Sequence, residues 1–217
     1  MKIIISPSKT ISKTVNKVKE KKNFSKETLE ILNKIPQIKL SDDLFYAFYM
    51  YDGLCFKNIK RENFDKSDLD YIDKHLFILS ALYGASKAFD LILPYRLDFL
   101  MKTDMGNLYK FWNDKIYKKV FKNEDLVINL ASDEFSKTIK KYIPYEKFLN
   151  VEFFENVNGK LKKHSTISKK ARGKMLYFMA KEKIENKDDI KNFNLDGYSF
   201  DKKNSTDENY IFIKNNE

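Results

Sequence analysis

The three arginines are the residues of this chain whose chemistry stands out most clearly. Only Arg61, Arg96 and Arg172 occur among 41 Lys and Arg residues, so lysine supplies almost all of the positive charge. A guanidinium carries a permanent charge on a planar fork that pairs with phosphate or carboxylate through two hydrogen bonds, which an ammonium cannot do. Because arginine is so rare here, we expect Arg96 and Arg172 to clamp phosphate.

One hydroxyl and two acids, Ser132, Asp133 and Glu134, follow an apolar run at residues 126–130 and precede an expected helix that extends to about residue 142. In this position Ser132 can contact phosphate, while Asp133 and Glu134 can act as general acid and base or bind a cation. The simpler interpretation is that Ser132 or Asp133 caps the helix and that both acids favour its positive end. Both interpretations remain open from the sequence.

The hydroxyl of Ser8 and the ammonium of Lys9 lie in the polar loop that follows the first apolar run, at residues 2–5. Ligands of α/β folds bind where strands end, so this loop is a candidate phosphate contact. The segment lacks the glycines of a P-loop, and an ordinary turn after Pro7 is the alternative. Lys87 is expected close to Arg96, near the turn at Gly84.

A dense group of cations, Lys169, Lys170, Arg172 and Lys174, opens the helix expected at residues 168–184. Amide groups at a helix start and nearby cations both favour phosphate. Gly173 costs about 1 kcal/mol relative to alanine inside a helix, so we expect it where another backbone comes close.

Hydrophobic periodicity predicts the elements that must position these groups. Short apolar runs predict strands at residues 2–5, 76–82 and 126–130, and Asn158-Gly159 predicts a hairpin between residues 148–156 and 160–166. The pattern of residues 197–200 and 210–213 predicts a last pair of strands. Helices are predicted at residues 26–35, 67–75 and 104–121. Residues 76–92 are interpreted as strand, turn and short helix, with a helix-hairpin-helix over residues 79–92 as the alternative.

Composition indicates one α/β domain spanning residues 1–217. Hydrophobic residues make up 42% of the chain, with only 6 Gly and 4 Pro. The net charge of +10 predicts a polyanion, most simply nucleic acid, although it can also reflect a solvated lysine surface. The single Cys55 excludes an intrachain disulfide, and with two distant histidines it makes a poor ligand set, so no metal and no cofactor are expected. No leader or membrane span is apparent, so we expect a monomeric cytoplasmic protein that does not bind membranes.

Motifs spread in order along the chain resemble those of the YaaA family of peroxide stress resistance proteins, also called UPF0246 or DUF328. The matching segments are Ser6-Pro7-Ser8-Lys9-Thr10, Leu79-Ser80-Ala81-Leu82-Tyr83-Gly84, Asp90-Leu91, Pro94-Tyr95-Arg96-Leu97, Leu108-Tyr109-Lys110-Phe111-Trp112, Asn129-Leu130-Ala131-Ser132-Asp133-Glu134, Lys169-Lys170-Ala171-Arg172-Gly173 and Gly197-Tyr198. This chain departs from the family pattern at Ser8, where alanine is frequent, at Ala81, where glycine is common, and at Ala85-Ser86-Lys87-Ala88, where an Arg-Pro pair is frequent.

The resemblance implies a mixed α+β fold, described as cantaloupe-like, in which helices surround a central mixed sheet beside a basic cleft. It implies sequence-independent binding of double-stranded DNA, a helix-hairpin-helix element and a role in limiting peroxide damage, including keeping free iron low. That element is expected at residues 79–92 or at residues 169–193.

Two classes of function follow. A DNA-binding protein would use Ser8, Lys9, Lys87, Arg96, Ser132, Lys169, Lys170, Arg172 and Lys174 as phosphate contacts. A nucleotide- or nucleic-acid-processing enzyme would add Asp133 or Glu134 as the catalytic acid or base. Whether the chain is an enzyme stays open, and any effect on iron is expected to be indirect.

Overall fold

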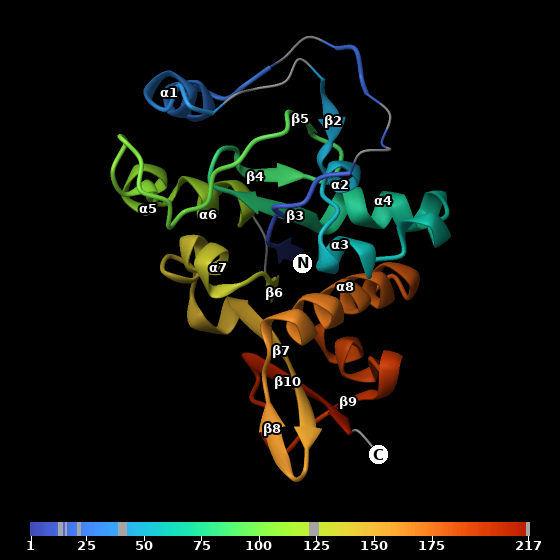
Figure 1. The fold of residues 1–217 in the computed structure, drawn as a ribbon. Helices are drawn as coiled ribbons and strands as arrows, with labels where there is room; N and C mark the ends of the chain where they lie inside the picture. Colours follow the sequence, from blue (N-terminus) through green and yellow to red (C-terminus); the bar gives the residue numbers. More distant parts are fainter. Residues whose placement is uncertain (13–14, 16, 21–22, 39–42, 122–125, 216–217) are drawn as a thin grey trace.

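A mixed eight-stranded sheet forms the centre of the molecule (Figure 1). The computed structural model describes residues 1–217 except 13–14, 16, 21–22, 39–42, 122–125 and 216–217. The strands of the sheet are β1 (Lys2–Ile5), β3 (Leu76–Ser80), β4 (Gly84–Lys87), β6 (Val127–Leu130), β7 (Phe148–Val157), β8 (Lys160–Lys162), β9 (Tyr198–Phe200) and β10 (Asn209–Asn215). They lie in the order β4-β3-β1-β6-β7-β10-β9, with β8 paired to β7. A separate pair contains β2 (Phe45–Tyr46) and β5 (Leu91–Ile92).

The first strand occupies a central position because all of its isoleucines are buried. β1 lies between β3 and β6 and is parallel to both, with Ile3 opposite Leu76 on one side and Ile128 on the other. The chain therefore goes from β1 to β3 on one side and later returns to form β6 on the opposite side of β1. Connections that diverge in this way leave a crevice beyond the carboxyl ends of the strands, where open α/β sheets place their ligands.

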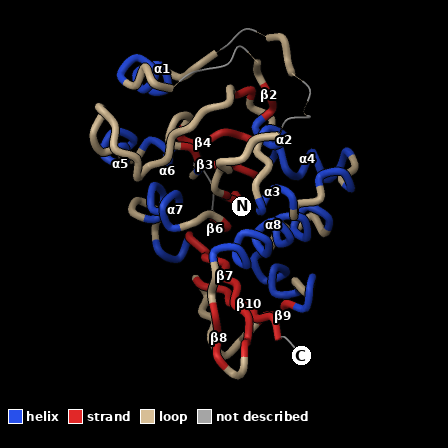
Figure 2. The backbone as a smooth tube through the Cα atoms, in the orientation of Figure 1, coloured by secondary structure: helices blue, strands red, loops and turns tan. Residues whose placement is uncertain are grey.

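Helices cover both faces of the sheet (Figure 2). Side chains of successive strand residues point to opposite faces, so Ile3 and Ile5 belong to one buried cluster and Ile4 to the other. The first cluster includes residues of α2 (Ala47–Met50), α3 (Leu54–Lys57), α4 (Lys66–His75) and α8 (Ser165–Lys181). The second includes residues of α1 (Lys26–Lys34), α5 (Leu108–Trp112), α6 (Lys115–Val120) and α7 (Asp133–Lys140). The mixed sheet surrounded by helices that we predicted is thus confirmed.

The segment after β3 corrects one of our predictions. A turn at Gly84 and a short helix after it were expected, but Gly84–Lys87 form β4, which pairs antiparallel with β3 from Ser80–Gly84 to Phe77–Lys87. Alanine, serine and lysine tolerate a helix, and the pairing with the buried β3 outweighs that weak local preference. The reversal depends on Gly84, whose φ is +71°. A Cβ at this position would lie 2.7 Å from the nearest atom of the Trp112 ring, so only glycine leaves room for that ring.

The helix predicted at residues 104–121 is shorter and divided. Asn113 adopts φ 46° and ψ −123°, which ends α5 before α6 begins at Lys115. Trp112 is 5% exposed and donates its indole N–H to the Ala81 carbonyl over 2.8 Å, so it belongs to the core, as expected.

The helices predicted at residues 26–35 and 67–75 are confirmed as α1 and α4. The Ser25 hydroxyl caps α1 by accepting the Thr28 amide. Asp65 and Asp68 form a capping box at α4, and Lys181 and Lys183 both donate to the buried Asp68 carboxylate. Asp68 therefore joins the start of α4 to the end of α8.

The strand pairings predicted in the carboxyl-terminal half are confirmed, but β8 ends at Lys162 rather than at residue 166, and α8 spans Ser165–Lys181 rather than residues 168–184. Asn158 and Gly159, both with positive φ, close the hairpin between β7 and β8, and β9 pairs antiparallel with β10. β10 in turn runs parallel to β7, so the first and last strands belong to one sheet. Two 3-10 helices, η3 (Lys187–Asn192) and η4 (Leu195–Gly197), precede β9; η1 (Arg61–Asn63) and η2 (Tyr145–Lys147) lie earlier in the chain.

One of the two positions considered for a helix-hairpin-helix is wrong. Residues 79–92 contain the β3–β4 turn, β4 and β5, which are incompatible with paired helices. At residues 169–193, α8 ends at Lys181, a turn with Lys183 at φ 50° follows, and η3 begins at Lys187. The helix-hairpin-helix remains a prediction for that segment. Among the helices of the described ranges, none is long and apolar enough to span a membrane.

Candidate functional site

A cavity of about 600 Å³ lies beyond the carboxyl ends of β1 and β6, where the crevice was expected. Five stretches far apart in sequence meet around it: the loop after β1, the start of α3, the segment after β5, the start of α7 and the start of α8. The lining residues are Ser6, Pro7, Ser8, Lys9, Thr10, Gly53, Leu54, Cys55, Phe56, Tyr95, Arg96, Leu97, Asp98, Leu130, Ser132, Glu134, Phe135, Ser165, Lys169 and Arg172.

The two strand ends are joined by a pair of serines. Ser6 Oγ lies 3.1 Å from Ser132 Oγ and accepts the Ser132 backbone N–H over 2.9 Å. Ser132 is the N-cap residue of α7, but its side chain makes no capping hydrogen bond. The interpretation of Ser132 as a capping side chain is therefore wrong, because its hydroxyl is directed to Ser6 in the cavity wall instead.

Two glycines allow the walls of the cavity to come together. A Cβ on Gly53 would lie 2.2 Å from Ser8 Oγ, so this glycine lets the loop after β1 pack against the start of α3. A Cβ on Gly173 would lie 2.1 Å from the Cys55 carbonyl oxygen. The close approach expected at Gly173 is thus confirmed. The glycine allows α8 to pack against α3, and the adjacent Arg172 therefore reaches the cavity.

Two buried polar atoms in the cavity have no partner among the described residues. They are Oε1 of Glu134 and Nε of Arg172. Burial lowers the pKa of Arg172, while Cys55, Asp133 and Glu152 oppose that change, and a guanidinium remains charged at neutral pH. Leaving such buried groups unpaired costs about 1–3 kcal/mol each, more when they are charged. A ligand carrying both a donor and an acceptor would remove that cost.

At the mouth of the cavity Asp98 holds two of the cations. Its carboxylate lies 2.9 Å from Arg96 and 3.4 Å from Lys9. The side chain of Asp98 is only 16% exposed, whereas those of Arg96 and Lys9 are 50% and 71% exposed. An incoming phosphate must therefore compete with Asp98 for both cations.

A hydrogen-bonded chain of hydroxyls supports the cavity from the β3 side. Tyr95 OH lies 2.6 Å from Ser80 Oγ and 3.1 Å from Tyr51 OH. Ser80 Oγ also accepts the amides of Leu82 and Tyr83 in the turn that follows β3. The position of Tyr95 in the wall thus depends on the end of β3, the neighbour of β1.

Seven of the eleven residues predicted for the site line this cavity: Ser8, Lys9, Arg96, Ser132, Glu134, Lys169 and Arg172. Asp133 is exposed at the start of α7 and acts on Arg172 only through its charge. Lys87 lies exposed on β4, and Lys170 is exposed on α8; neither belongs to the lining. Lys174 forms an ion pair with Asp196 outside the lining.

The remaining arginine is structural. Arg61 donates to the backbone carbonyls of Phe48 and Tyr51, with an N···O distance of 3.1 Å to Tyr51, and pairs with Asp52 at 3.4 Å. Its guanidinium lies 5.8 Å from the Phe48 ring centroid. Its planar fork thus holds the turn between α2 and α3 rather than a ligand.

Several residues of the lining were not among those predicted for the site, including Ser6, Cys55 and Asp98. Ser6 begins one of the recognised motifs and Asp98 directly follows another, and these positions were the only available signals. Cys55 was interpreted as an inert core residue, and burial raises the pKa of its thiol to about 12, which disfavours the reactive thiolate. Among the described residues there is no group of three or more His, Cys, Asp or Glu that could hold a metal ion.

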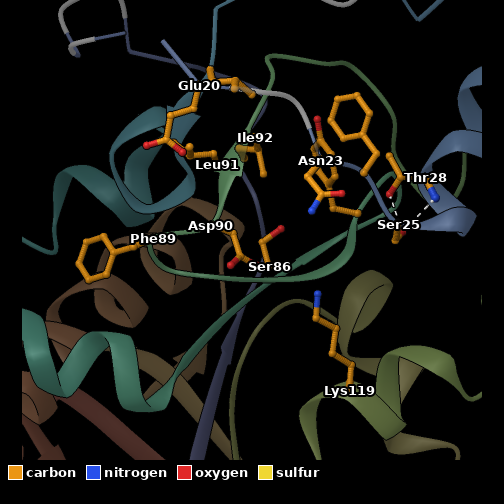
Figure 3. Close-up of a pocket in the computed structure, with 13 residues that line it drawn as sticks. Glu20, Asn23, Ser25, Thr28, Ser86, Phe89, Asp90, Leu91, Ile92 and Lys119 are labelled. Carbon is orange, nitrogen blue, oxygen red and sulfur yellow. Dashed lines mark hydrogen bonds between the residues drawn. The ribbon is translucent and has the colours of Figure 1, made fainter. Parts of the chain in front are cut away.

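A second cavity, of about 390 Å³, lies between the start of α1 and the strands β4 and β5 (Figure 3). Three of its polar side chains already serve the fold: Ser25 caps α1, Thr28 donates to the Leu82 carbonyl, and Asp90 accepts the Lys87 amide. It contains none of the predicted site residues.

Comparison with known proteins identifies the family. Residues 34–204 match the family model described as peroxide stress protein YaaA. The chain belongs to the YaaA family. A UPF0246 protein of Agathobacter rectalis is 37% identical over 98% of both chains, and one of Fusobacterium nucleatum is 37% identical over the whole of both. A UPF0246 protein of Clostridioides difficile is 39% identical over 87% of this chain and 78% of its own length.

Proposed function

We propose that this protein binds duplex DNA through phosphate contacts during the response to peroxide. The observation that carries the proposal is the convergence of Lys9, Arg96, Lys169 and Arg172 on one cavity from three separate parts of the chain. Arg172 contributes a buried Nε that lacks a partner among the described residues. A phosphate oxygen is the acceptor that a guanidinium fork pairs with best.

The surroundings of the cavity favour a polyanion over a small isolated anion. Lys170 extends the cationic surface of α8 beyond the mouth, where it is exposed. The whole chain carries a net charge of +10. Contacts of this kind are made to the backbone, so the proposed binding is independent of base sequence and weakens as salt rises.

The role in peroxide stress is supported by membership of the YaaA family. We assign the proposed protection from iron-dependent damage to the DNA-bound state of the protein. In that state the protein would cover DNA that iron and peroxide would otherwise damage.

The test is duplex affinity against salt concentration. Affinity should fall linearly on logarithmic axes, with a slope of about −0.9 for each phosphate neutralised. Lys169→Gln should weaken binding and reduce the magnitude of the slope by about 1. Lys160→Gln, on the exposed strand β8 outside the cavity lining, removes the same charge and should change neither quantity. An affinity independent of salt would refute the proposal.

A second candidate is an enzyme that processes nucleotides or nucleic acid, and the buried unpaired oxygen of Glu134 favours it. Of the two acids considered, Glu134 lines the cavity and the exposed Asp133 does not, so the acid or base would be Glu134. Glu134→Gln keeps the size of the side chain and removes proton transfer. Loss of nucleic-acid turnover in this variant, with Asp133→Asn active, would support the enzyme; equal activity of both variants would exclude the catalytic role of Glu134.

A further inference from the structure

The dimensions of the cavity decide what can enter it. At about 600 Å³ it falls in the range of 300–1,000 Å³ typical of sites for small molecules. A DNA duplex cannot enter a space of that size, so backbone contacts at the mouth leave the interior unoccupied. If the protein binds DNA as proposed, the interior can take only a group smaller than the duplex.

The wall of the cavity suits a flat ring with a polar edge. Phe56, Tyr95 and Phe135 contribute aromatic side chains, and Leu97 and Leu130 contribute aliphatic ones. Flat bases bind between such side chains, and their edges carry N–H donors beside acceptors. Oε1 of Glu134 is an acceptor without a partner among the described residues, and it can take an N–H of a base.

The mouth of the cavity suits the phosphate that such a base would carry. Lys9 and Arg96 are at least half exposed there, and Lys169, which also lines the cavity, is exposed on α8. Arg172 lies deeper, because its guanidinium is partly buried and its Nε fully so. An apolar interior with an acceptor, surrounded by cations at its opening, matches one nucleotide rather than a base or a phosphate alone.

An exposed apolar side chain stands beside this mouth. The chain makes a tight turn at residues 98–101, in which the Met101 amide donates to the Asp98 carbonyl over 3.2 Å. Phe99 is 3% exposed and stacks on Tyr109, which anchors the turn, whereas Leu100 is 68% exposed. Proteins that distort DNA insert leucine and similar side chains between base steps as wedges.

We infer that the cavity binds a single nucleotide swung out of the DNA strand, with Leu100 inserted into the position that the base has left. The inference rests on the proposed binding of duplex DNA and adds the part of the DNA that the cavity takes. The base lies among the aromatic side chains with an N–H toward Glu134, and its flanking phosphates contact the cations Lys9, Arg96, Lys169 and Arg172.

The experiment uses a duplex with one 2-aminopurine, whose fluorescence rises when it leaves the base stack, and measures binding separately by anisotropy. The wild type should raise the fluorescence on binding and should bind a duplex with one mismatched pair on the order of tenfold more tightly, since a mismatched base is easier to extrude. Glu134→Gln and Leu100→Ala should at least halve the fluorescence rise at saturating protein. The control Leu29→Ala, which truncates an exposed leucine of α1 outside the cavity lining, should leave it unchanged.

The outcomes separate this inference from the proposed function. Salt-dependent duplex binding without a rise in fluorescence would overturn the inference and leave the DNA-binding proposal intact. Absence of duplex binding would overturn both. A free nucleotide from solution could fill the cavity in place of an extruded one, and titration with deoxyadenosine monophosphate tests this. Extrusion would be refuted if the free nucleotide bound tightly, if Glu134→Gln weakened that binding, and if the 2-aminopurine fluorescence did not change on DNA binding. Urea unfolding of each variant verifies that its fold is intact.

Discussion

Replacing Gly173 by alanine sets two effects against each other. Alanine is preferred over glycine inside a helix by about 1 kcal/mol, so helix propensity alone predicts a more stable protein. Gly173, however, lies where α8 touches α3, and its new Cβ would lie 2.1 Å from the Cys55 carbonyl oxygen and 2.9 Å from the Asn58 Cβ. Contacts below 3.0 Å do not persist, so α8 must move away by about 1 Å.

The displacement should outweigh the gain in helix propensity. Overpacking of a buried contact costs about 1–3 kcal/mol, and a clash with a backbone atom belongs at the upper end, because a carbonyl cannot rotate away as a side chain can. Subtracting the propensity gain leaves a net loss of about 2 kcal/mol. Arg172 is adjacent on the same helix, so its guanidinium should also shift within the cavity.

Urea unfolding measures the net effect. With a slope of about 2–3 kcal/mol per molar urea, Gly173→Ala should lower the midpoint by roughly 1 M. Lys170→Ala, at an exposed position of the same helix, serves as the control and should change the free energy of unfolding by less than about 0.5 kcal/mol. A higher midpoint for Gly173→Ala would show that α8 and α3 are not in the tight contact described here.

Three further predictions test other parts of the structure. Burial alone would raise the pKa of Asp68, but the hydrogen bonds from its two lysine partners lower it to about 2, so its stabilisation is present above about pH 4 and is lost as the pH falls toward 2. Asp68→Asn should therefore cost at most about 2 kcal/mol at pH 7 and about half of that at pH 3, measured by urea unfolding; a cost independent of pH would contradict this. Asp98→Asn should tighten duplex binding about two- to fivefold, because it removes an ion pair worth about 0.5–1 kcal/mol that competes with phosphate for Arg96. The control Asp70→Asn changes the net charge equally on the exposed face of α4 and should leave duplex affinity unchanged. Because burial raises the pKa of Cys55 to about 12, iodoacetamide should modify the unfolded protein far faster than the native one at pH 8, and equal rates would refute the burial of the thiol.

Local signals were sufficient for most of the strands and helices. β1 contains three consecutive buried isoleucines, and β6 is buried throughout and apolar except for Asn129, which is the pattern of strands buried on both faces. Asn158-Gly159 fixed the β7–β8 hairpin because both residues tolerate positive φ. Gly173 was interpreted correctly because a glycine inside a helix has a cost that only a close contact explains.

The errors arose where distant contacts decide the structure. β4 is a strand because it pairs with β3, and nothing in its own residues indicates that. The break at Asn113 requires a backbone conformation that the helical spacing of the flanking residues concealed.

The site was predictable in its residue types but not in its geometry. The rarity of arginine led to Arg96 and Arg172, and the position after the first strand led to Ser8; all three line the cavity. The contact between Ser6 and Ser132 spans 126 positions, so no local pattern could show that the Ser132 hydroxyl leaves its helix uncapped. The division between Glu134 inside the cavity and Asp133 outside it depends on the direction of successive side chains at the start of α7, which spacing alone does not determine.

The most direct test of the account measures duplex affinity against salt for the wild type and for the double variant Arg96→Lys, Arg172→Lys, which keeps the net charge. The account predicts that affinity drops at least tenfold at every salt concentration while urea unfolding stays cooperative, because a lysine cannot form the paired hydrogen bonds of a guanidinium with phosphate. Superimposable binding curves would contradict it, since they would mean that the general positive charge of the lysines binds DNA and that the arginines in the cavity do not contact it.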